Sequence, residues 1–211
     1  HNREQADKCL QIIAASLQPG MSEQDCELLI RDWLRAHQLF DPARPPKVRF
    51  AGQPTRRRFG LNRPGKRRYR IGMSYILRCD AVQNGYVAKA SLSGPASVLA
   101  PLHARLRDIR EQLPRTLHQG ETPQQLASQF PGLRQHYRLA PLTGTLPEGN
   151  RIDDAPLIQG LWQWQLTLSD GPYSVACSEF LLMDDQGPRW LTATPAHLLD
   201  NSNNDKQEEA A

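Results

Sequence analysis

Apolar residues recur at helical spacing in two stretches near the start of the chain. Between residues 3 and 18 the apolar positions that share one face are Ala6, Cys9, Leu10, Ile13 and Leu17. Pro19-Gly20 interrupts this pattern, and Ser22 with Asp25 then forms a Ser-x-x-Asp capping sequence. It is followed by the apolar residues Leu28, Leu29, Ile30, Trp33 and Leu34. We therefore predict a helix over residues 3–18 and a second helix that begins at Ser22.

Short stretches in the middle of the chain have the pattern of β-strands. They cover residues 74–79 and 86–92, and residues 48–52 carry a similar strand end. The connection between the first two is Gln83-Asn84-Gly85, and Asn-Gly favours a two-residue turn because both residues tolerate a positive φ angle. The pattern predicts a β-hairpin at this place.

Helical spacing returns later in the chain and then gives way to further strands. The face of a helix over residues 95–113 is formed by Leu99, Leu102, Leu106, Ile109 and Leu113. A shorter helix is expected to begin at Thr122-Pro123 and to end before Pro131-Gly132. The remainder predicts strands, most clearly over residues 160–168, 173–183 and 189–192, with a turn at 184–187. Trp162 and Trp164 share one strand face, where core packing is the expected role.

Size and composition are those of a soluble globular protein. The 211 residues are 39% apolar and 23% charged, which is enough for a substantial core. No run approaches the roughly 20 apolar residues of a membrane helix, and no amino-terminal segment has the pattern of a signal peptide. The four cysteines are far apart and form no Cys-x-x-Cys pair, which argues against a zinc ribbon or a dense disulfide framework. We expect a cytoplasmic protein that does not associate with a membrane.

The net charge of +4 conceals a strong asymmetry along the chain. Residues 44–70 contain eleven Lys or Arg and no Asp or Glu, whereas the rest has 15 basic and 22 acidic residues. One interpretation is a solvated loop that pairs with acidic residues of this chain or of a second subunit. The other is a weak surface for anions or nucleic acid, formed by Arg56, Arg57, Arg58, Lys66, Arg67 and Arg68. The block lacks the regular aromatic interleaving of single-strand binders, so nucleic-acid binding is the weaker interpretation.

The segment from Arg78 to Lys89 carries the most specific motif of the chain. It reads Arg-Cys-Asp-Ala-Val-Gln-Asn-Gly-Tyr-Val-Ala-Lys. It resembles the first ligand pair of the pita-bread metallopeptidases, the superfamily of methionine aminopeptidase, aminopeptidase P, prolidase and creatinase. In that pattern two Asp residues bind a pair of divalent ions, and a glycine and an aromatic residue stand between them. Gly85-Tyr86 matches this glycine and aromatic residue, which places Arg78 and Lys89 at the two ligand positions, eleven residues apart.

The resemblance extends over about residues 3–200. Glu179, followed by apolar residues, an acidic-Gly turn and Leu191-Thr192, is similar to the family's closing motif and would be the last, bridging ligand. Gln165 stands fourteen residues earlier, where prolidase-like members have a Glu, and His136 falls loosely at the position of the His ligand. Two further family histidines would fall near Thr143 and near Arg58 or Phe59.

These substitutions remove most of the expected metal ligands. A site for two dications needs several carboxylates to neutralise and bridge the ions, whereas Arg78 and Lys89 stay positive near neutral pH. We therefore expect no di-metal hydrolase site and no cofactor. One alternative remains, a single ion held by Asp80, His136 and Glu179, because Asp80 shares a strand face with Arg78.

The resemblance implies an α+β pita-bread fold, with a curved, mostly antiparallel sheet backed by helices. We expect one such domain over residues 1–200 and a disordered polar tail over residues 201–211. The family also contains members that only bind, including the peptidase-like domain of the FACT histone chaperone. The leading interpretation is therefore a metal-free, catalytically degenerate protein. It would bind an anionic small molecule, a peptide or a protein partner in the former active-site pocket, through Arg78, Lys89, Asp80, Gln165 and Glu179.

Two alternatives use the same residues differently. Arg78 and Lys89 would pair internally with Glu179 and Asp80, so that a salt-bridge cluster replaces the metals. Otherwise His136 would act as a general base and Glu179 would orient a substrate, in a creatinase-like hydrolase or lyase that needs no metal. The resemblance leaves open whether the protein forms a homodimer.

Overall fold

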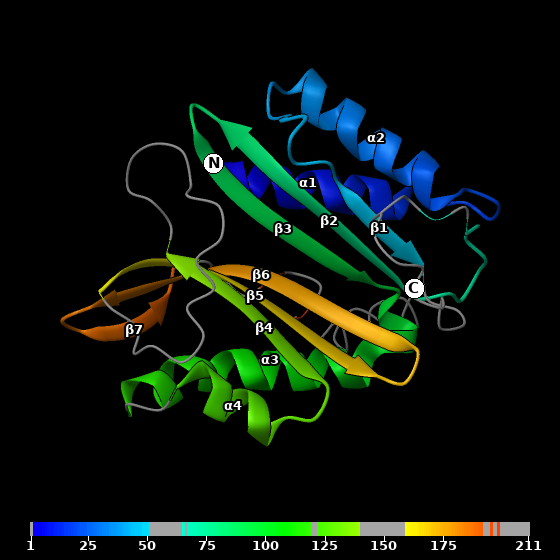
Figure 1. Cartoon of the computed structure of the whole chain (residues 1–211). Helices are drawn as coiled ribbons and strands as arrows, with labels where there is room; N and C mark the ends of the chain where they lie inside the picture. The colour runs from blue at the N-terminus through cyan, green and yellow to red at the C-terminus, as the bar shows by residue number, and fades with distance from the viewer. Residues whose placement is uncertain are drawn as a thin grey trace, which may run out of the picture.

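The computed structural model describes residues 2–50, 65, 67–119, 122–139, 159–191, 195 and 198. In these ranges the chain forms four helices and seven strands (Figure 1). The helices are α1 (Asn2–Ala15), α2 (Glu23–Ala36), α3 (Ala96–His118) and α4 (Pro123–Gln129). The strands are β1 (Lys47–Phe50), β2 (Tyr75–Gln83), β3 (Tyr86–Gly94), β4 (Leu133–Leu139), β5 (Gly160–Asp170), β6 (Tyr173–Asp184) and β7 (Gly187–Trp190). The predicted tail over residues 201–211 lies outside the described part of the chain.

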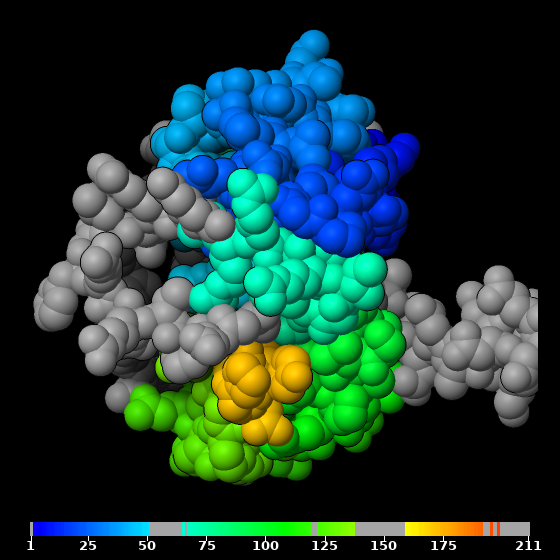
Figure 2. Space-filling model, turned by 90° about the vertical axis from the view of Figure 1, so that its right-hand side faces the viewer, coloured from blue at the N-terminus to red at the C-terminus, as the bar shows by residue number. Residues whose placement is uncertain are grey.

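The strands form two antiparallel sheets, in the orders β1-β2-β3 and β4-β5-β6-β7. Helices α1 and α2 pack on the first sheet, and α3 and α4 pack on the second (Figure 1). Because β3 runs beside β6, the two sheets continue one another as one curved surface with a helical layer on its outer side. Seen from the end, the half built on the first sheet lies above the half built on the second (Figure 2). The predicted α+β architecture, a mostly antiparallel curved sheet backed by helices, is confirmed.

Local sequence signals account for the helix boundaries. The Ser22 hydroxyl accepts from the Asp25 amide at 3.1 Å, and the Asp25 carboxylate accepts from the Ser22 amide at 2.8 Å, which completes the predicted capping box of α2. Helix α1 ends earlier than predicted because its last turn tightens, with the Leu17 amide bonded to the Ala14 carbonyl. Helix α3 instead continues past Leu113 and runs through Pro114 to His118. None of the described helices combines the length and apolar composition needed to cross a bilayer.

The predicted hairpin joins β2 and β3. Asn84 and Gly85 adopt φ angles of 52° and 79°, the left-handed values that a two-residue hairpin turn requires. Both strands are longer than predicted and stay paired from Gln83↔Tyr86 to Tyr75↔Gly94. The hairpin therefore places Arg78 and Lys89 on adjacent strands, as the resemblance implies.

The core consists of two clusters, one between each sheet and its helices. The first is formed around α1, α2 and the first sheet by residues such as Leu10, Ile30, Phe50 and Leu77. The second is formed around α3 and the second sheet by residues such as Leu106, Ile109, Trp162 and Trp164. Both tryptophans are fully buried, so their predicted packing role is confirmed, and Trp164 stacks on Tyr137 with 4.7 Å between ring centroids.

Side chains join the two sheets along the seam between β3 and β6. In the described residues the sheets share no backbone ladder, although their edges run together. The Ser91 and Ser178 hydroxyls are 2.8 Å apart, and the Ser93 hydroxyl accepts from the Ala176 amide at 2.9 Å. The Ser93 contact satisfies a main-chain amide at the edge of β6, whereas the Ser91–Ser178 contact joins the two sheets through side chains alone.

Candidate functional site

Polar residues cover the inner face of both sheets, the face turned away from the helices. Successive strand residues point to opposite faces, so residues that alternate with core positions share the inner one. The core positions Leu77, Cys79, Trp164 and Cys177 identify the helix side of their strands. The inner face accordingly carries Arg78, Asp80, Lys89, Ser91, Gln163, Gln165, Thr167 and Ser178.

A row of polar residues crosses this face from one sheet to the other. His136, Gln165 and Ser178 stand directly opposite one another on β4, β5 and β6. Ser178 contacts Ser91 across the seam, and Ser91 stands opposite Arg78 on β2. The structure therefore brings three of the predicted site residues, Arg78, His136 and Gln165, into one row.

A pocket of about 90 Å³ lies where this row meets the seam. Its lining comes from both sheets and consists of Lys89, His136, Tyr137, Gln163 and Gln165. Three of these residues were predicted from the sequence, whereas Gln163 and Tyr137 were not. Gln163 is two positions before Gln165 on the same strand, so the alternation of the strand could have identified it.

Lys89 forms an ion pair inside the first sheet. Its Nζ lies 3.7 Å from Asp80 Oδ2, and the two residues are direct cross-strand partners. Arg44 Nη1 approaches the same carboxylate oxygen at 3.5 Å. Asp80 thus stands between two cations, and Arg44 also pairs with Asp41, whose Oδ2 lies 3.5 Å from the Arg44 Nε. The internal pairing of Lys89 with Asp80, one of the predicted alternatives, is found.

Arg78 is a largely buried cation beside the pocket. Its Nη2 donates to Thr167 Oγ1 across the seam at 3.0 Å. Its Nε is buried and has no hydrogen-bond partner among the residues that the structure describes. Burial, and secondarily the charge of Arg49, lowers the pKa of the guanidinium to about 10, so it remains charged at neutral pH. Arg78 therefore brings to the inner face a positive charge that no carboxylate of the described residues pairs.

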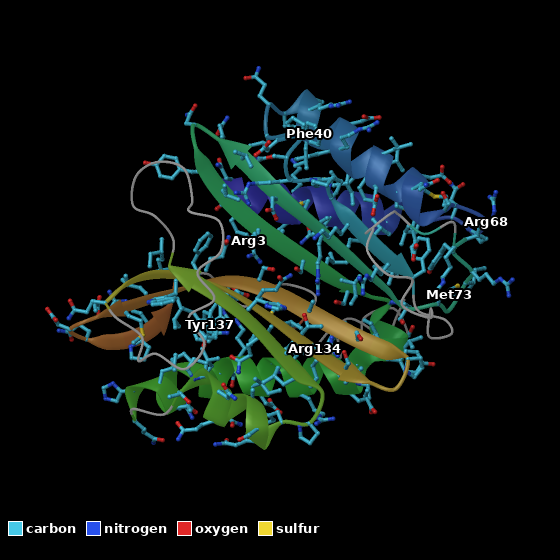
Figure 3. All side chains as sticks on the ribbon, in the orientation of Figure 1. Arg3, Phe40, Arg68, Met73, Arg134 and Tyr137 are labelled. Carbon is cyan, nitrogen blue, oxygen red and sulfur yellow. The ribbon has the colours of Figure 1, made fainter. Side chains whose placement is uncertain are left out.

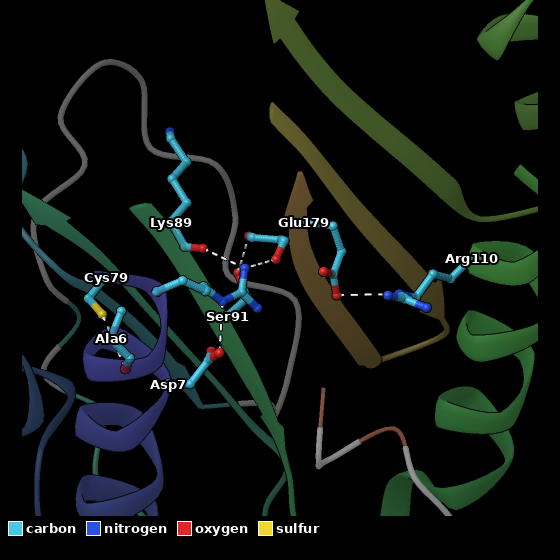
Figure 4. A network of polar contacts seen from close by, with 9 residues as sticks. Ala6, Asp7, Cys79, Lys89, Ser91, Arg110 and Glu179 are labelled. Atoms are coloured by element: carbon cyan, nitrogen blue, oxygen red, sulfur yellow. Dashed lines mark hydrogen bonds and ion pairs between the residues drawn. The ribbon is translucent and has the colours of Figure 1, made fainter. Parts of the chain in front are cut away.

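Glu179 points away from the pocket, which corrects the expected set of site residues. It stands opposite Trp164 on the helix side of β6, whereas its neighbour Ser178 faces inward. Its Oε1 is 3.4 Å from Arg110 Nε of α3, as Figure 4 shows. Because Glu179 and Gln165 lie on opposite faces, Glu179 is not placed to pair with Arg78 or Lys89, nor to meet a ligand with them.

The inner face does not fit the two-metal site that the fold family implies. Within the described ranges, no three or more His, Cys, Asp or Glu residues are grouped so that they could hold a metal ion. Two of the expected ligand positions are cationic, Glu179 faces the helices, and Asp80 already pairs with Lys89 and Arg44. Nor does this placement support the single ion considered for Asp80, His136 and Glu179.

The described part of the basic block makes structural contacts. Arg67 donates to the Phe50 carbonyl, and Arg68 donates to the Gly20 carbonyl at 2.7 Å, at the edge of the molecule labelled in Figure 3. Four other residues of the predicted anion surface, Arg56, Arg57, Arg58 and Lys66, lie outside the described residues, as do Phe59 and Thr143. Binding of nucleic acid by this block stays a prediction.

Comparison with known proteins identifies the fold. No family model matches the sequence, and no curated protein matches it significantly. Among solved structures, the X-Pro aminopeptidase of Thermotoga maritima has a TM-score of 0.68 at 14% identity, over 92% of this chain and 59% of that one. A dipeptidase of Pyrococcus horikoshii has a TM-score of 0.65 at 20% identity, over 92% and 58%. The N-terminal domain of a FACT complex subunit from Eremothecium gossypii has a TM-score of 0.61 at 14% identity, over 92% and 54%.

These similarities show the pita-bread fold, as the sequence resemblance implied. The chain spans somewhat more than half the length of each of these structures, between 54% and 59%. At identities of 14% to 20% the likeness concerns the fold, and the pocket has to be interpreted from its own residues.

Proposed function

We propose that this chain is a catalytically degenerate pita-bread protein that binds the carboxylate of a small molecule or peptide without a metal ion. The observation that carries this proposal is the pocket lined by Lys89, His136, Gln163 and Gln165. It lies on the inner face that also carries the charged, largely buried Arg78.

The charge of the pocket favours an anion. Lys89 brings a positive charge to the pocket lining itself, and its contact with Asp80 is long, at 3.7 Å. Arg78 adds a second positive charge in a region where burial weakens screening by solvent. A carboxylate near these groups would form charge-assisted hydrogen bonds, which are stronger than neutral ones.

The two glutamines supply recognition that does not depend on charge. Each carboxamide offers two donors and one acceptor oxygen, so Gln163 and Gln165 can bond either a carboxylate oxygen or an amide group beside it. A volume of about 90 Å³ suits one small group of a ligand rather than a whole peptide. A free carboxylate at the end of a peptide or protein chain has this size.

The fold neighbours support a peptide end as the test ligand. One carries the name X-Pro aminopeptidase and another is a dipeptidase, whereas a third is a domain of a FACT complex subunit. For the present chain, whose inner face lacks a fitting metal-ligand set in its described residues, binding without metal-dependent hydrolysis agrees with the pocket.

Calorimetric titration with N-acetylglycine tests the proposal, and N-acetylglycinamide is the matched neutral ligand. We expect the acid to bind and the amide to bind at least tenfold more weakly, since a charged hydrogen bond contributes about 1.5–3 kcal/mol. Lys89→Gln should lower the affinity for N-acetylglycine to that for N-acetylglycinamide. Arg189→Gln is the control, because Arg189 pairs with Asp184 at the exposed β6–β7 turn. Equal binding of acid and amide, or unchanged binding by Lys89→Gln, would refute the proposal.

Catalysis by His136 is the second candidate, because His136 also lines the pocket and stands opposite Gln165. It would act as a general base in a creatinase-like, metal-independent hydrolase or lyase. Glu179 lies on the other face, so a substrate would be oriented by the glutamines. This candidate would be supported if the metal-stripped protein hydrolysed dipeptides or guanidino acids and the His136→Gln variant did not. Equal turnover by the wild type and by His136→Gln would refute a catalytic role of His136.

A further inference from the structure

Arg3, in the first turn of α1, lies in the seam between the two sheets (Figure 3). Its Nη1 donates to the main-chain carbonyl of Lys89 on β3 at 2.8 Å and to that of Ser178 on β6. Its Nε donates to Asp7 Oδ2 at 2.8 Å, one helical turn further along α1. With 12% of its side chain exposed, Arg3 is almost enclosed by these contacts.

The position of this guanidinium matters because the seam lacks a continuous ladder in the described residues. Elsewhere in each sheet, several main-chain hydrogen bonds fix the spacing of neighbouring strands. Between β3 and β6 the hydroxyls of Ser91 and Ser93 contribute two contacts, and Arg3 contributes a bond to each strand. Both carbonyls accept from one nitrogen, Nη1, while the Nε of the same planar fork is held by Asp7, so the guanidinium imposes a distance between the two carbonyls.

The proposed ligand pocket crosses the same seam. Lys89 comes from the first sheet, whereas His136, Gln163 and Gln165 come from the second. Arg3 bonds the main chain of Lys89 itself, so it acts at the residue that supplies the positive charge of the pocket. The distance from Lys89 to the two glutamines therefore depends on the spacing that Arg3 maintains.

We propose that Arg3 is a positioning residue, which sets the spacing of the two sheets and so the geometry in which Lys89 and the glutamines meet one carboxylate. Asp7 holds the guanidinium in the required orientation. The effect on affinity rests on the proposed function, whereas the effect on the spacing of the sheets does not.

Replacement of Arg3 tests the effect on affinity. Arg3→Gln should weaken binding of N-acetylglycine about tenfold, and Arg3→Lys, which keeps the charge but not the fork, should weaken it as well. Leu113→Ala is the matched destabilised control, because Leu113 is fully buried on α3 in the second core and is no part of the seam. This control should lose stability and keep its affinity. Equal losses of affinity in Arg3→Gln and Leu113→Ala would reduce Arg3 to a general stabilising role.

The distance between two spin labels tests the spacing directly and needs no ligand. The four native cysteines are buried, so Tyr86→Cys on the first sheet and Gln186→Cys at the β6–β7 turn can be labelled selectively. Arg3→Gln should broaden or shift the distance distribution between the labels, and Leu113→Ala should leave it unchanged. If the wild type fails to bind N-acetylglycine, the proposed function fails while this measurement still decides the role of Arg3. An unaltered distance distribution in Arg3→Gln overturns the inference.

Discussion

Glu179 of β6 and Arg110 of α3 form a buried ion pair, with 3.4 Å between Oε1 and Nε. The two side chains are 1% and 6% exposed. Arg110 also lies over the ring of Trp190, 5.2 Å from its centroid, and its main-chain carbonyl accepts from the Trp190 indole. The carboxylate that the resemblance placed in the site therefore joins a sheet to its covering helix and does not line the pocket.

Loss of the Glu179 charge should destabilise the protein without lowering its affinity for N-acetylglycine. Glu179→Gln keeps the volume but leaves the Arg110 charge buried without its counter-charge, which costs about 3–5 kcal/mol in comparable pairs. Chemical denaturation measures this loss of stability. The control is Arg189→Gln, which removes the exposed Arg189–Asp184 ion pair and should change the free energy of unfolding by less than about 1 kcal/mol. The apolar double variant Arg110→Met, Glu179→Leu should recover most of the stability. Weaker binding of N-acetylglycine with unchanged stability would place Glu179 back in the ligand site.

Removal of the Asp80 charge should strengthen anion binding. In Asp80→Asn the positive charges of Lys89 and Arg44 lose the carboxylate that they share at 3.7 and 3.5 Å. These side chains are partly exposed, so we expect a gain in affinity for N-acetylglycine of about two- to fivefold. Titration at two salt concentrations checks the cause, since the gain should shrink as salt rises. A loss of affinity would mean that Asp80 instead orients Lys89 for the ligand.

The charge of Arg78 should destabilise the folded protein at neutral pH. Its pKa is lowered to about 10 by burial, so the charged form is disfavoured in the folded state. The folded value lies below the unfolded one, and the penalty is present in full at neutral pH and is relieved only as pH rises above about 10. Arg78→Met should therefore stabilise the protein at pH 7.5 by about 1–3 kcal/mol and weaken carboxylate binding.

The matched variant Arg78→Lys separates charge from shape. Lys keeps the positive charge but cannot reproduce the guanidinium contact with Thr167. We expect it to keep part of the affinity and to gain little stability. Denaturation and calorimetric titration of both variants measure these effects. A much lower stability of Arg78→Met than of the wild type would contradict this account.

His103 should make stability depend on pH in the acid range. It is buried on α3, and burial lowers its pKa although a hydrogen bond to the Ser93 main chain opposes this effect. The unfolded chain thus binds the proton more readily, and stability falls as pH drops below about 6.5, by at most about 1.4 kcal/mol per pH unit. Denaturation at pH 7.5 and 5.5 measures the fall, which should be smaller in His103→Gln. The same fall in both proteins would assign it to other groups.

Much of the fold follows from local patterns. The capping box at Ser22 and the Asn84-Gly85 turn are confirmed. The spacing of apolar residues located the helices, although α1 ends earlier and α3 ends later than predicted. The pairing of Arg78 and Lys89 on adjacent strands follows from the hairpin. Three pocket residues, Lys89, His136 and Gln165, were found from the motif spacing.

Glu179 shows where such reasoning stops. On a strand, a step of one residue moves a side chain to the opposite face, so its direction depends on the register with the neighbouring strand. The match to the family motif did not determine this register, and pairing with Trp164 places Glu179 on the helix side. Arg110, its partner, is 69 residues away in sequence.

The amino-acid sequence by itself determined the helices, the hairpin and the likeness to the pita-bread fold. It could do so because periodicity, capping and turn chemistry act over a few residues. Only the tertiary structure decided that Glu179 faces α3 and that Arg3 joins Lys89 to Ser178, contacts that span 86 and 175 residues. Contacts at such separations arise from the packing of whole sheets and leave no local pattern in the chain.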